Sequence, residues 1–245
     1  MRRRLFIASS ISAALAGCAP IGTKLNDSGF HEVLLSAEKL NEFAIGTRGM
    51  AKEYGDADVD RDFRVNGFAT PSDSAYEALL RVNFSSYRLV VDGSVERPLA
   101  LSLHQLQLMS TAPQITRHDC VEGWSAIGKW SGVPLRTVLE LAHPTDDARF
   151  VVFHCMDVSP EGLPYYESLN LHQARHPQAL LAVALNDRPL DADHGAPVRL
   201  RVPTQLGYKS AKWIKRIEVA GSFANLYSGK GGYWEDQGYE WYAGI

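Results

Sequence analysis

The stretch RHDCVEGWSAIGKWSGVPL, residues 117–135, surrounds one cysteine with glycines, two tryptophans and a proline. Cys120 ends the run ITRHDC, which we expect to form an extended strand. Because several glycines and Pro134 follow it, the sequence predicts a turn-rich loop after the thiol. A backbone of this kind can approach a bulky ligand closely.

The chain has three cysteines, at positions 18, 120 and 155, and the role of Cys120 has three readings. A disulfide with Cys155 is the simplest reading in an oxidising compartment, and two inert core thiols are the second. The third reading is a thiolate that binds a transition metal. No second Cys or His lies at zinc spacing from Cys120, so a metal there needs an organic cofactor to supply its other ligands.

A second candidate segment is DHGAPVRLRVPTQLGYKSAKW, residues 193–213. Its cations Arg199, Lys209 and Lys212 occur together with Gly207 and Ser210, and fixed cations beside accessible backbone N–H groups suit a phosphate-bearing ligand. His194 can donate to the same ligand. A strand with solvated basic side chains is the alternative for this segment taken alone.

The N-terminus MRRRLFIASSISAALAGCAP has the layout of an export signal, with basic residues, a short apolar run and small residues, so residues 1–18 are predicted to be removed. The paired arginines at 3 and 4 are typical of a twin-arginine signal, which exports folded proteins. The end of the run, LAGC, is similar to a bacterial lipobox that anchors the mature chain to the membrane through a lipidated Cys18. Ordinary cleavage near Ala19 is the alternative, and both predict a periplasmic location.

After the signal, we expect an N-terminal extension over 19–75 and one main domain over 76–245. The extension is polar and irregular, with one helix-compatible segment within 32–43 and a charged surface loop, GDADVDRDFRVNG, at 55–67. In the main domain, strands alternate irregularly with short helices, which predicts a mixed α+β fold. The aromatic C-terminal tail, GKGGYWEDQGYEWYAGI, should pack down on this domain.

Expected strands cover YRLVVDG, ITRHDC, ARFVVFHCM, ALLAVAL, PVRLRVP and KWIKRIEVAG, and expected helices cover LHQLQLM, capped by Ser102, and RTVLELA, begun by Pro134. The formal net charge of −3 at pH 7, with no block of like charges, gives no reason to expect a nucleic-acid partner.

Taken together, CVEGWS, the following W-x-GVPL, HGAPVRLRVP and GYKSAKW resemble the sulfite-oxidase-type molybdopterin oxidoreductase family. The resemblance covers residues 83–219 and is strongest to the bacterial branch that contains the periplasmic methionine-sulfoxide reductases. It implies that Cys120 is the sole protein ligand of molybdenum, whose other ligands are the dithiolene sulfurs of one pterin and terminal oxygens. A disulfide between Cys120 and Cys155 is then not expected.

The resemblance also implies a set of cofactor-binding positions. Arg199 corresponds to the arginine that meets the pterin phosphate region, and Cys155 to a pocket residue that is threonine in relatives. The implied cofactor-binding set is Asn83, Cys120, Cys155, His194, Arg199, Lys209, Ser210, Ala211 and Lys212. The chain ends soon after the KWIKRIEV strand, so we expect neither an appended immunoglobulin-like domain nor the dimer that such a domain forms.

The implied activity is two-electron oxygen-atom transfer on a small-molecule substrate, with reduction of a sulfoxide or a similar S- or N-oxide as the first reading. No haem-binding C-x-x-C-H occurs, so electrons are expected from a separate membrane or periplasmic protein, with a haem b subunit as one candidate. Sulfite-type oxidation that passes electrons to a cytochrome is the alternative, for which Arg117 is the one local extra arginine. A non-enzymatic envelope lipoprotein is the second alternative.

The proton-handling residues are left open by the sequence. His118 and Glu122 flank the thiol and can exchange protons, although Glu122 can equally serve only to support the loop. Three tyrosines are candidates for the pocket wall: Tyr165, Tyr166 and Tyr208.

Overall fold

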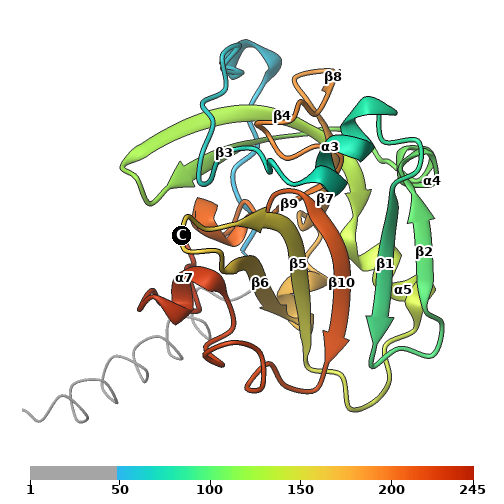
Figure 1. Cartoon of the computed structure of the whole chain (residues 1–245). Coiled ribbons are helices and arrows are strands. Elements are labelled where there is room, and N and C mark those ends of the chain that lie inside the picture. Colours follow the sequence, from blue (N-terminus) through green and yellow to red (C-terminus); the bar gives the residue numbers. More distant parts are fainter. Residues whose placement is uncertain (1–48) are drawn as a thin grey trace, which may run out of the picture. The chain divides into compact units, whose positions relative to one another are not determined.

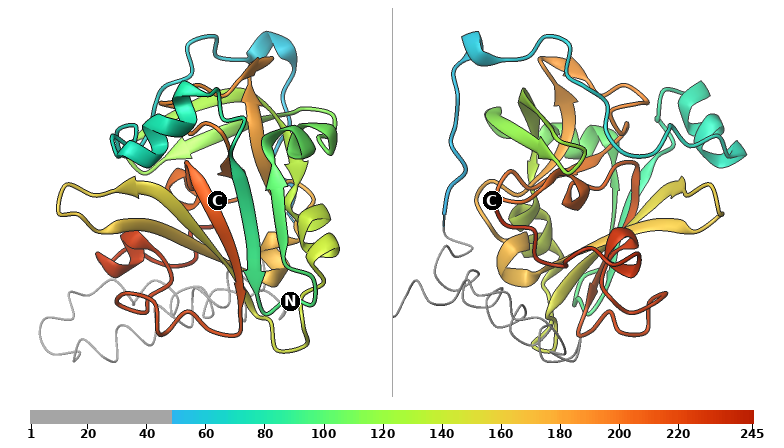
Figure 2. Two further views of the ribbon diagram at one scale, coloured as in Figure 1. Left: turned by 45° about the vertical axis from the view of Figure 1, so that its right-hand side comes forward. Right: turned by 90° about the vertical axis from the view of Figure 1, so that its left-hand side faces the viewer.

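Two β-sheets form the framework of the protein in its computed structural model, which describes residues 49–245 (Figures 1 and 2). One sheet has the strand order β2-β1-β10-β5-β6 and the other has the order β3-β4-β7-β8, with β9 also paired to β7. β1 and β10 run parallel, whereas the other pairs in both sheets are antiparallel. The strands are β1 (Arg88–Gly93), β2 (Leu99–Ser102), β3 (Gln114–Cys120), β4 (Trp124–Pro134), β5 (Phe150–Val158), β6 (Pro164–Asn170), β7 (Leu180–Leu185), β8 (Arg188–Pro189), β9 (Arg199–Arg201) and β10 (Ile214–Ala220).

Short helices connect these strands, and the mixed α+β class predicted from the sequence is confirmed. The helices are η2 (Asp56–Asp58), α3 (Ser74–Arg81), α4 (Leu103–Leu108), α5 (Leu135–Ala142), α6 (Leu171–Ala174), η3 (Gly207–Lys209) and α7 (Tyr233–Asp236). The predicted export signal with Cys18, and the helix expected within 32–43, lie outside the described residues. None of the described helices is long and apolar enough to cross a membrane.

Local sequence signals explain where several elements begin and end. Ser102 caps α4 through a reciprocal capping box, in which its hydroxyl accepts from the Gln105 N–H and the Gln105 side chain accepts from the Ser102 N–H at 2.9 Å. Asn186 and Asp187 adopt positive φ angles of 51° and 62°, which the tight turn from β7 to β8 requires. The predicted cap and the predicted turn are both confirmed.

The turn-rich loop expected after Cys120 is wrong, because this stretch forms a long hairpin. Cys120 pairs with Trp124 across a short turn, and β4, which has 11 residues, lies beside β3 as far as Trp130 and then pairs with β7. The glycines of β4 serve close packing between strands and not turning. A Cβ on Gly132 would lie 2.0 Å from the carbonyl oxygen of Leu181 in β7, so only glycine lets these strands approach.

The segment 49–75 was predicted as a polar extension with a surface loop, but it crosses the domain and enters its core. The N–H of Tyr54 donates to Ile115 in β3 at 2.9 Å, and Phe63 is 4% exposed. The Phe63 ring meets Trp130 edge-on at a centroid distance of 5.1 Å. Charge and glycine content suggested a solvated loop, whereas its one phenylalanine anchors it to the core.

The C-terminal tail packs down on the domain, as predicted. Phe223 contacts Phe150 of β5 with ring centroids 4.6 Å apart, and the indole N–H of Trp241 donates to the Ser168 hydroxyl of β6 at 2.8 Å. The tail therefore covers part of the β5–β6 face and brings α7 beside β6 (Figure 1).

The Gly132 contact gives a test of the hairpin packing. We expect Gly132→Ala to lower the thermal midpoint by at least about 4 °C, because the added methyl group overpacks against backbone that cannot move alone. Gly55→Ala is the matched control, since its Cβ would meet nothing closer than 3.6 Å. Equal midpoints for the two variants, measured by differential scanning calorimetry, would contradict this account of β4 and β7.

Candidate functional site

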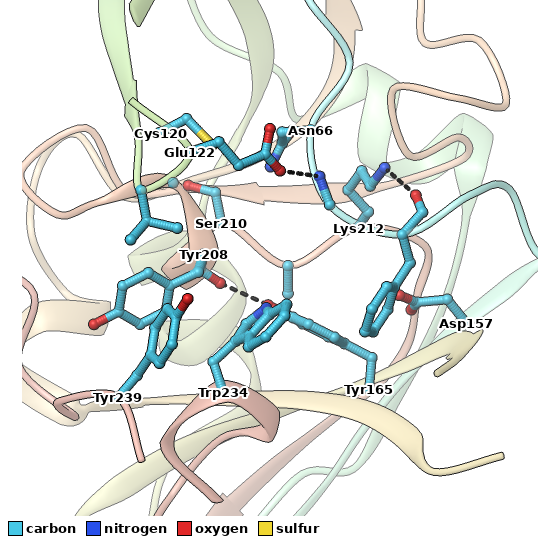
Figure 3. Close-up of a pocket in the computed structure, with 15 residues that line it drawn as sticks. Asn66, Cys120, Glu122, Asp157, Tyr165, Tyr208, Ser210, Lys212, Trp234 and Tyr239 are labelled. Atoms are coloured by element: carbon cyan, nitrogen blue, oxygen red, sulfur yellow. Dashed lines mark hydrogen bonds between the residues drawn. The ribbon is translucent and has the colours of Figure 1, made fainter. Parts of the chain in front are cut away.

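A pocket with a cavity volume of about 110 Å³ opens beside Cys120 (Figure 3). Five segments supply its walls: residues 66–68, the turn from β3 to β4, the β5–β6 hairpin, residues 207–212 and the C-terminal tail. The first and last of these segments lie at opposite ends of the described chain. The pocket therefore exists only when the two ends have packed onto the sheets.

Cys120 is the last residue of β3 and lines the pocket. The N–H of Gly123, at φ +88°, donates to the Cys120 carbonyl at 3.0 Å and closes the turn that presents the thiol. Burial raises the pKa of this thiol, while the backbone N–H of Glu122 and the charge of Arg64 act in the opposite direction. Cys120 and Cys155 are both free thiols, so the disulfide reading is excluded.

Glu122 supports the turn from inside the pocket. Its carboxylate accepts from the indole N–H of Trp124 at 2.9 Å and from the N–H of Gly67 at 3.4 Å. These contacts tie the segment before α3 to the hairpin that bears Cys120. Of the two roles left open for Glu122, the structure thus shows loop support.

Ser210, Ala211 and Lys212 follow η3 and line the pocket together, as the resemblance implied. The Lys212 ammonium donates to the carbonyls of Phe68 at 3.0 Å and Asp193 at 3.1 Å. Burial, followed by the charge of Arg199, lowers the pKa of Lys212 to about 7. Lys212 therefore holds the pocket wall through two uncharged carbonyl acceptors, and it forms no ion pair with a carboxylate among the described residues.

Arg199 and Arg201 are buried behind this wall, and both lie close to Trp130. Their guanidinium carbons lie 5.0 and 4.9 Å from the Trp130 ring centre, which places both within cation–π range. Arg199 donates to Asn66 and to the Ser210 carbonyl, both in the pocket wall. Within residues 49–245 neither guanidinium forms an ion pair, and both Nε atoms lack a hydrogen-bond partner. Burial lowers their pKa values, to about 10 for Arg199 and about 9 for Arg201.

His118 is a neutral imidazole between Arg201 and Gly207 and does not exchange protons near neutral pH. Its Nδ1 accepts from Arg201 at 2.9 Å, which leaves the proton on Nε2. Burial, reinforced by the nearby cations, holds the pKa of His118 well below its usual value. Its Nε2 edge presses against Gly207, where an added Cβ would lie only 2.3 Å away.

The structure places Lys209 outside the pocket lining, although the resemblance implied that it binds the cofactor. It is fully buried and donates to Glu167 and, at 2.6 Å, to Glu235 of α7. Burial and the neighbouring Glu235 raise the pKa of Glu167 well above its usual value, so one lysine holds a carboxylate pair that keeps a proton. This charge triad fastens α7 to β6.

Four other predicted cofactor contacts also lie outside the pocket lining: Arg199, which is buried behind it, and Asn83, Cys155 and His194. Asn83 is exposed at the end of α3, with φ 47°. Cys155 is buried in β5 opposite Ile214, where burial raises its pKa. The ring nitrogens of His194 form hydrogen bonds with Asp191 and with the Phe63 carbonyl. The His194 carbonyl accepts from Arg199.

The pocket has members that the sequence did not reveal. Asn66 lines the pocket, and it lies within the stretch interpreted as a solvated loop. Asp157 lines the end of the pocket opposite Cys120 in Figure 3, with one carboxyl oxygen lacking a partner, and burial raises its pKa to about 7. Trp234 and Tyr239 enter from the tail. Of the three candidate tyrosines, Tyr165 and Tyr208 line the pocket, whereas the Tyr166 hydroxyl donates to Asp236.

These groups fit a molybdenum–molybdopterin cofactor. Cys120 offers one soft sulfur ligand, and no cluster of three or more His, Cys, Asp or Glu side chains in the described part of the chain can hold a metal alone. Arg199 and Arg201 form no ion pair within residues 49–245, and one N–H group each of Arg199, Arg201 and His118 lacks a hydrogen-bond partner. A bound anion would compensate these buried donors. The orphaned oxygen of Asp157 can accept from the N–H groups of a pterin ring.

Residues 76–225 match the oxidoreductase molybdopterin binding domain family. The chain belongs to this family. It is therefore an oxidoreductase that binds molybdenum–molybdopterin, and the predicted family, fold and cofactor are confirmed. A non-enzymatic lipoprotein is not supported.

Two curated relatives extend beyond the matched domain. A protein of Azospira oryzae named "Putative protein-methionine-sulfoxide reductase subunit YedZ1" is 36% identical over 250 residues, covering 99% of this chain and 87% of the relative. The protein-methionine-sulfoxide reductase catalytic subunit MsrP of Campylobacter jejuni is 34% identical over 199 residues, covering 76% and 67%. Among solved structures, the sulfane dehydrogenase SoxCD from Paracoccus pantotrophus overlaps 56% of this chain and 39% of its own, with 22% identity and a TM-score of 0.49.

The charge triad predicts a pH-dependent stability defect. Lys209→Met leaves two buried carboxyl groups without their cation, which we expect to cost about 3–5 kcal/mol of unfolding free energy near pH 7. Burial and the neighbouring Glu235 raise the folded-state pKa of Glu167 above its unfolded value, so the stability that its protonated form retains at low pH is lost as pH rises. The variant should therefore approach the wild type near pH 5 and diverge toward pH 8 in urea unfolding.

The matched control is Lys209→Met combined with Glu167→Gln and Glu235→Gln, which removes the carboxyl groups as well. We expect this triple variant to lose the pH dependence. An equal loss of unfolding free energy at pH 5 and pH 8 in Lys209→Met would contradict the role of Lys209 as the counter-charge of Glu167 and Glu235.

Proposed function

We propose that this protein is the exported catalytic subunit of a sulfoxide reductase, with methionine sulfoxide as the substrate. The carrying observation is the placement of Cys120 in a pocket whose walls hold buried cations and aromatic rings. The names of both relatives, which cover most of this chain, supply the substrate class. Reduction of a sulfoxide takes two electrons and two protons and yields a thioether and water.

When bound, the molybdenum cofactor supplies two-electron oxygen-atom transfer. The protein's own residues prepare the place for it. Cys120 provides the thiolate ligand, and Ser210, Ala211 and Lys212 line the path of the pterin with Arg199 behind them. The buried cations stabilise negative charge in a site that excludes most water.

The sulfite alternative depended on Arg117, which the structure places elsewhere. Arg117 is exposed and pairs with Asp119 at 2.9 Å, and it does not line the pocket. The one cation in the pocket lining is Lys212, whose ammonium is engaged by two carbonyls. A sulfite dianion therefore finds no extra arginine here, and an uncharged sulfoxide suits the pocket better.

The partner and location follow from the N-terminal signal and from the subunit names of the relatives. We propose export to the periplasm by the twin-arginine pathway after the cofactor has been loaded, with anchoring through a lipidated Cys18. Electrons then come from a separate membrane subunit, for which a haem b protein is the first candidate. Labelling with a radioactive fatty acid, abolished by Cys18→Ala, tests the anchor.

Purified holoprotein, expressed with intact molybdopterin synthesis, tests the function. We expect it to reduce methionine sulfoxide with a reduced viologen dye as electron donor, and to leave sulfite unoxidised with ferricyanide as acceptor. Cys120→Ser should lose molybdenum, measured by elemental analysis, together with more than about 99% of the activity, because the hard hydroxyl is a poor substitute for a soft thiolate.

Cys155→Ala is the matched thiol control and should keep its molybdenum, since Cys155 lies in the core of β5. Full molybdenum retention by Cys120→Ser would refute the ligand assignment. Sulfite oxidation without sulfoxide reduction would instead replace the proposed substrate.

A further inference from the structure

Three aromatic side chains, Tyr208, Trp234 and Tyr239, line the pocket on the side facing Cys120 (Figure 3). Trp234 stacks on Tyr239, with ring centroids 5.1 Å apart and an interplanar angle of 29°. Tyr239 meets Tyr208 edge-on at 5.4 Å and 85°. These three residues are called the aromatic wall below.

Two of the three residues come from a segment beyond the matched domain, which ends at residue 225. Trp234 belongs to α7, and the other side chains at this part of the helix contact groups outside the aromatic wall. Tyr233 packs against Tyr165, with ring centroids 5.7 Å apart. Glu235 is held by Lys209, and Asp236 accepts from the Tyr166 hydroxyl at 2.7 Å. α7 is thus fixed on three sides, which leaves Trp234 to face the pocket.

The wall keeps apolar surface in contact with water. Tyr239 is 40% exposed and Trp234 is partly exposed, although each ring is already positioned by stacking. Exposed aromatic rings at a pocket are typical of binding sites, because a ligand recovers the hydrophobic free energy that the folded chain leaves unused. The Tyr208 hydroxyl donates to the Glu240 carbonyl at 2.7 Å, so its ring and not its hydroxyl is turned to the pocket.

The chemistry of a methyl sulfoxide matches such a wall. Its sulfur and methyl carbons carry partial positive charge, whereas its oxygen is negative. Aromatic faces are negative and favour sulfur and polarised methyl groups. The oxygen is then directed away from the rings, toward the thiol side of the pocket and the buried cations behind it.

From this geometry we propose that Trp234 and Tyr239 are specificity-determining residues, which bind the methyl–sulfur end of a methyl sulfoxide. The inference deepens the proposed function and rests on it. It assigns substrate recognition to the C-terminal segment, while metal binding stays with Cys120 on the β3–β4 hairpin. Recognition and chemistry therefore come from separate parts of the chain.

The test separates the Michaelis constant from turnover in the holoenzyme. Trp234→Leu and Tyr239→Leu should each raise the KM for methionine sulfoxide about 5- to 10-fold, with little change in kcat, because the lost contact is made equally in the ground and transition states. Trp234→Phe should recover most of the affinity, since it restores an aromatic face. Molybdenum content and the electron paramagnetic resonance signal of the Mo(V) state should match the wild type in all three variants.

Tyr227→Leu is the matched control on the same tail. Tyr227 is 53% exposed, packs on Tyr166 and does not line the pocket, so its removal should leave KM unchanged. An unchanged KM in both leucine variants overturns the proposal. Loss of molybdenum from either leucine variant that keeps its wild-type melting temperature also overturns it, because the wall would then hold the cofactor.

A binding titration distinguishes failure of this inference from failure of the proposed function. Methionine sulfoxide should quench the indole fluorescence of the holoenzyme, and the quenched component should be missing in Trp234→Leu. Quenching through Trp234 without any turnover would refute sulfoxide reduction but keep the recognition site. Turnover without quenching, at a KM that the variants do not alter, would refute the recognition site alone.

Discussion

The central constraint in this protein is a pair of buried arginines that have no carboxylate partner in the described chain. Arg199 and Arg201 both lie within cation–π range of Trp130, and their hydrogen bonds go to carbonyls, hydroxyls, an amide and one imidazole. Burying a cation without a counter-charge costs free energy, and the cation–π interaction with an aromatic ring offsets only part of it. The interior is therefore electrostatically incomplete without an anion. The same buried cations explain why His118 stays neutral beside Arg201.

The second constraint is the close spacing of strands around the thiol. Gly132 lets β4 approach β7, and Gly207 makes room for His118, so the hairpin that ends at Cys120 is pressed against the segment that carries Ser210. Both contacts leave no space for a side chain. Cys120 and residues 210–212 of the candidate site are thus placed by close packing against backbone at Gly132 and against the buried His118 ring at Gly207.

Local patterns predicted the fold class and most elements, since the caps, turns and apolar runs at Ser102, Asn186 and β5 act within a few residues. The motifs also predicted Cys120 and residues 210–212 of the site. What they missed depends on contacts between distant segments. Lys209 looked like a phosphate-binding cation because its partners, Glu167 and Glu235, lie 42 and 26 residues away. Asn66 and Trp234 were missed for the same reason, because nothing local shows that both chain ends fold back over the sheets.

Residues 244 and 245 pack close to the candidate site, which matters for how the protein is handled. The Ile245 N–H donates to Thr204 at 3.1 Å, and Gly244 pairs with Gln205, only a few residues before the segment that lines the pocket. Residues 244 and 245 therefore help to shape this edge of the site. A purification tag fused at Ile245 would begin within this contact, so a tag placed elsewhere preserves the native edge.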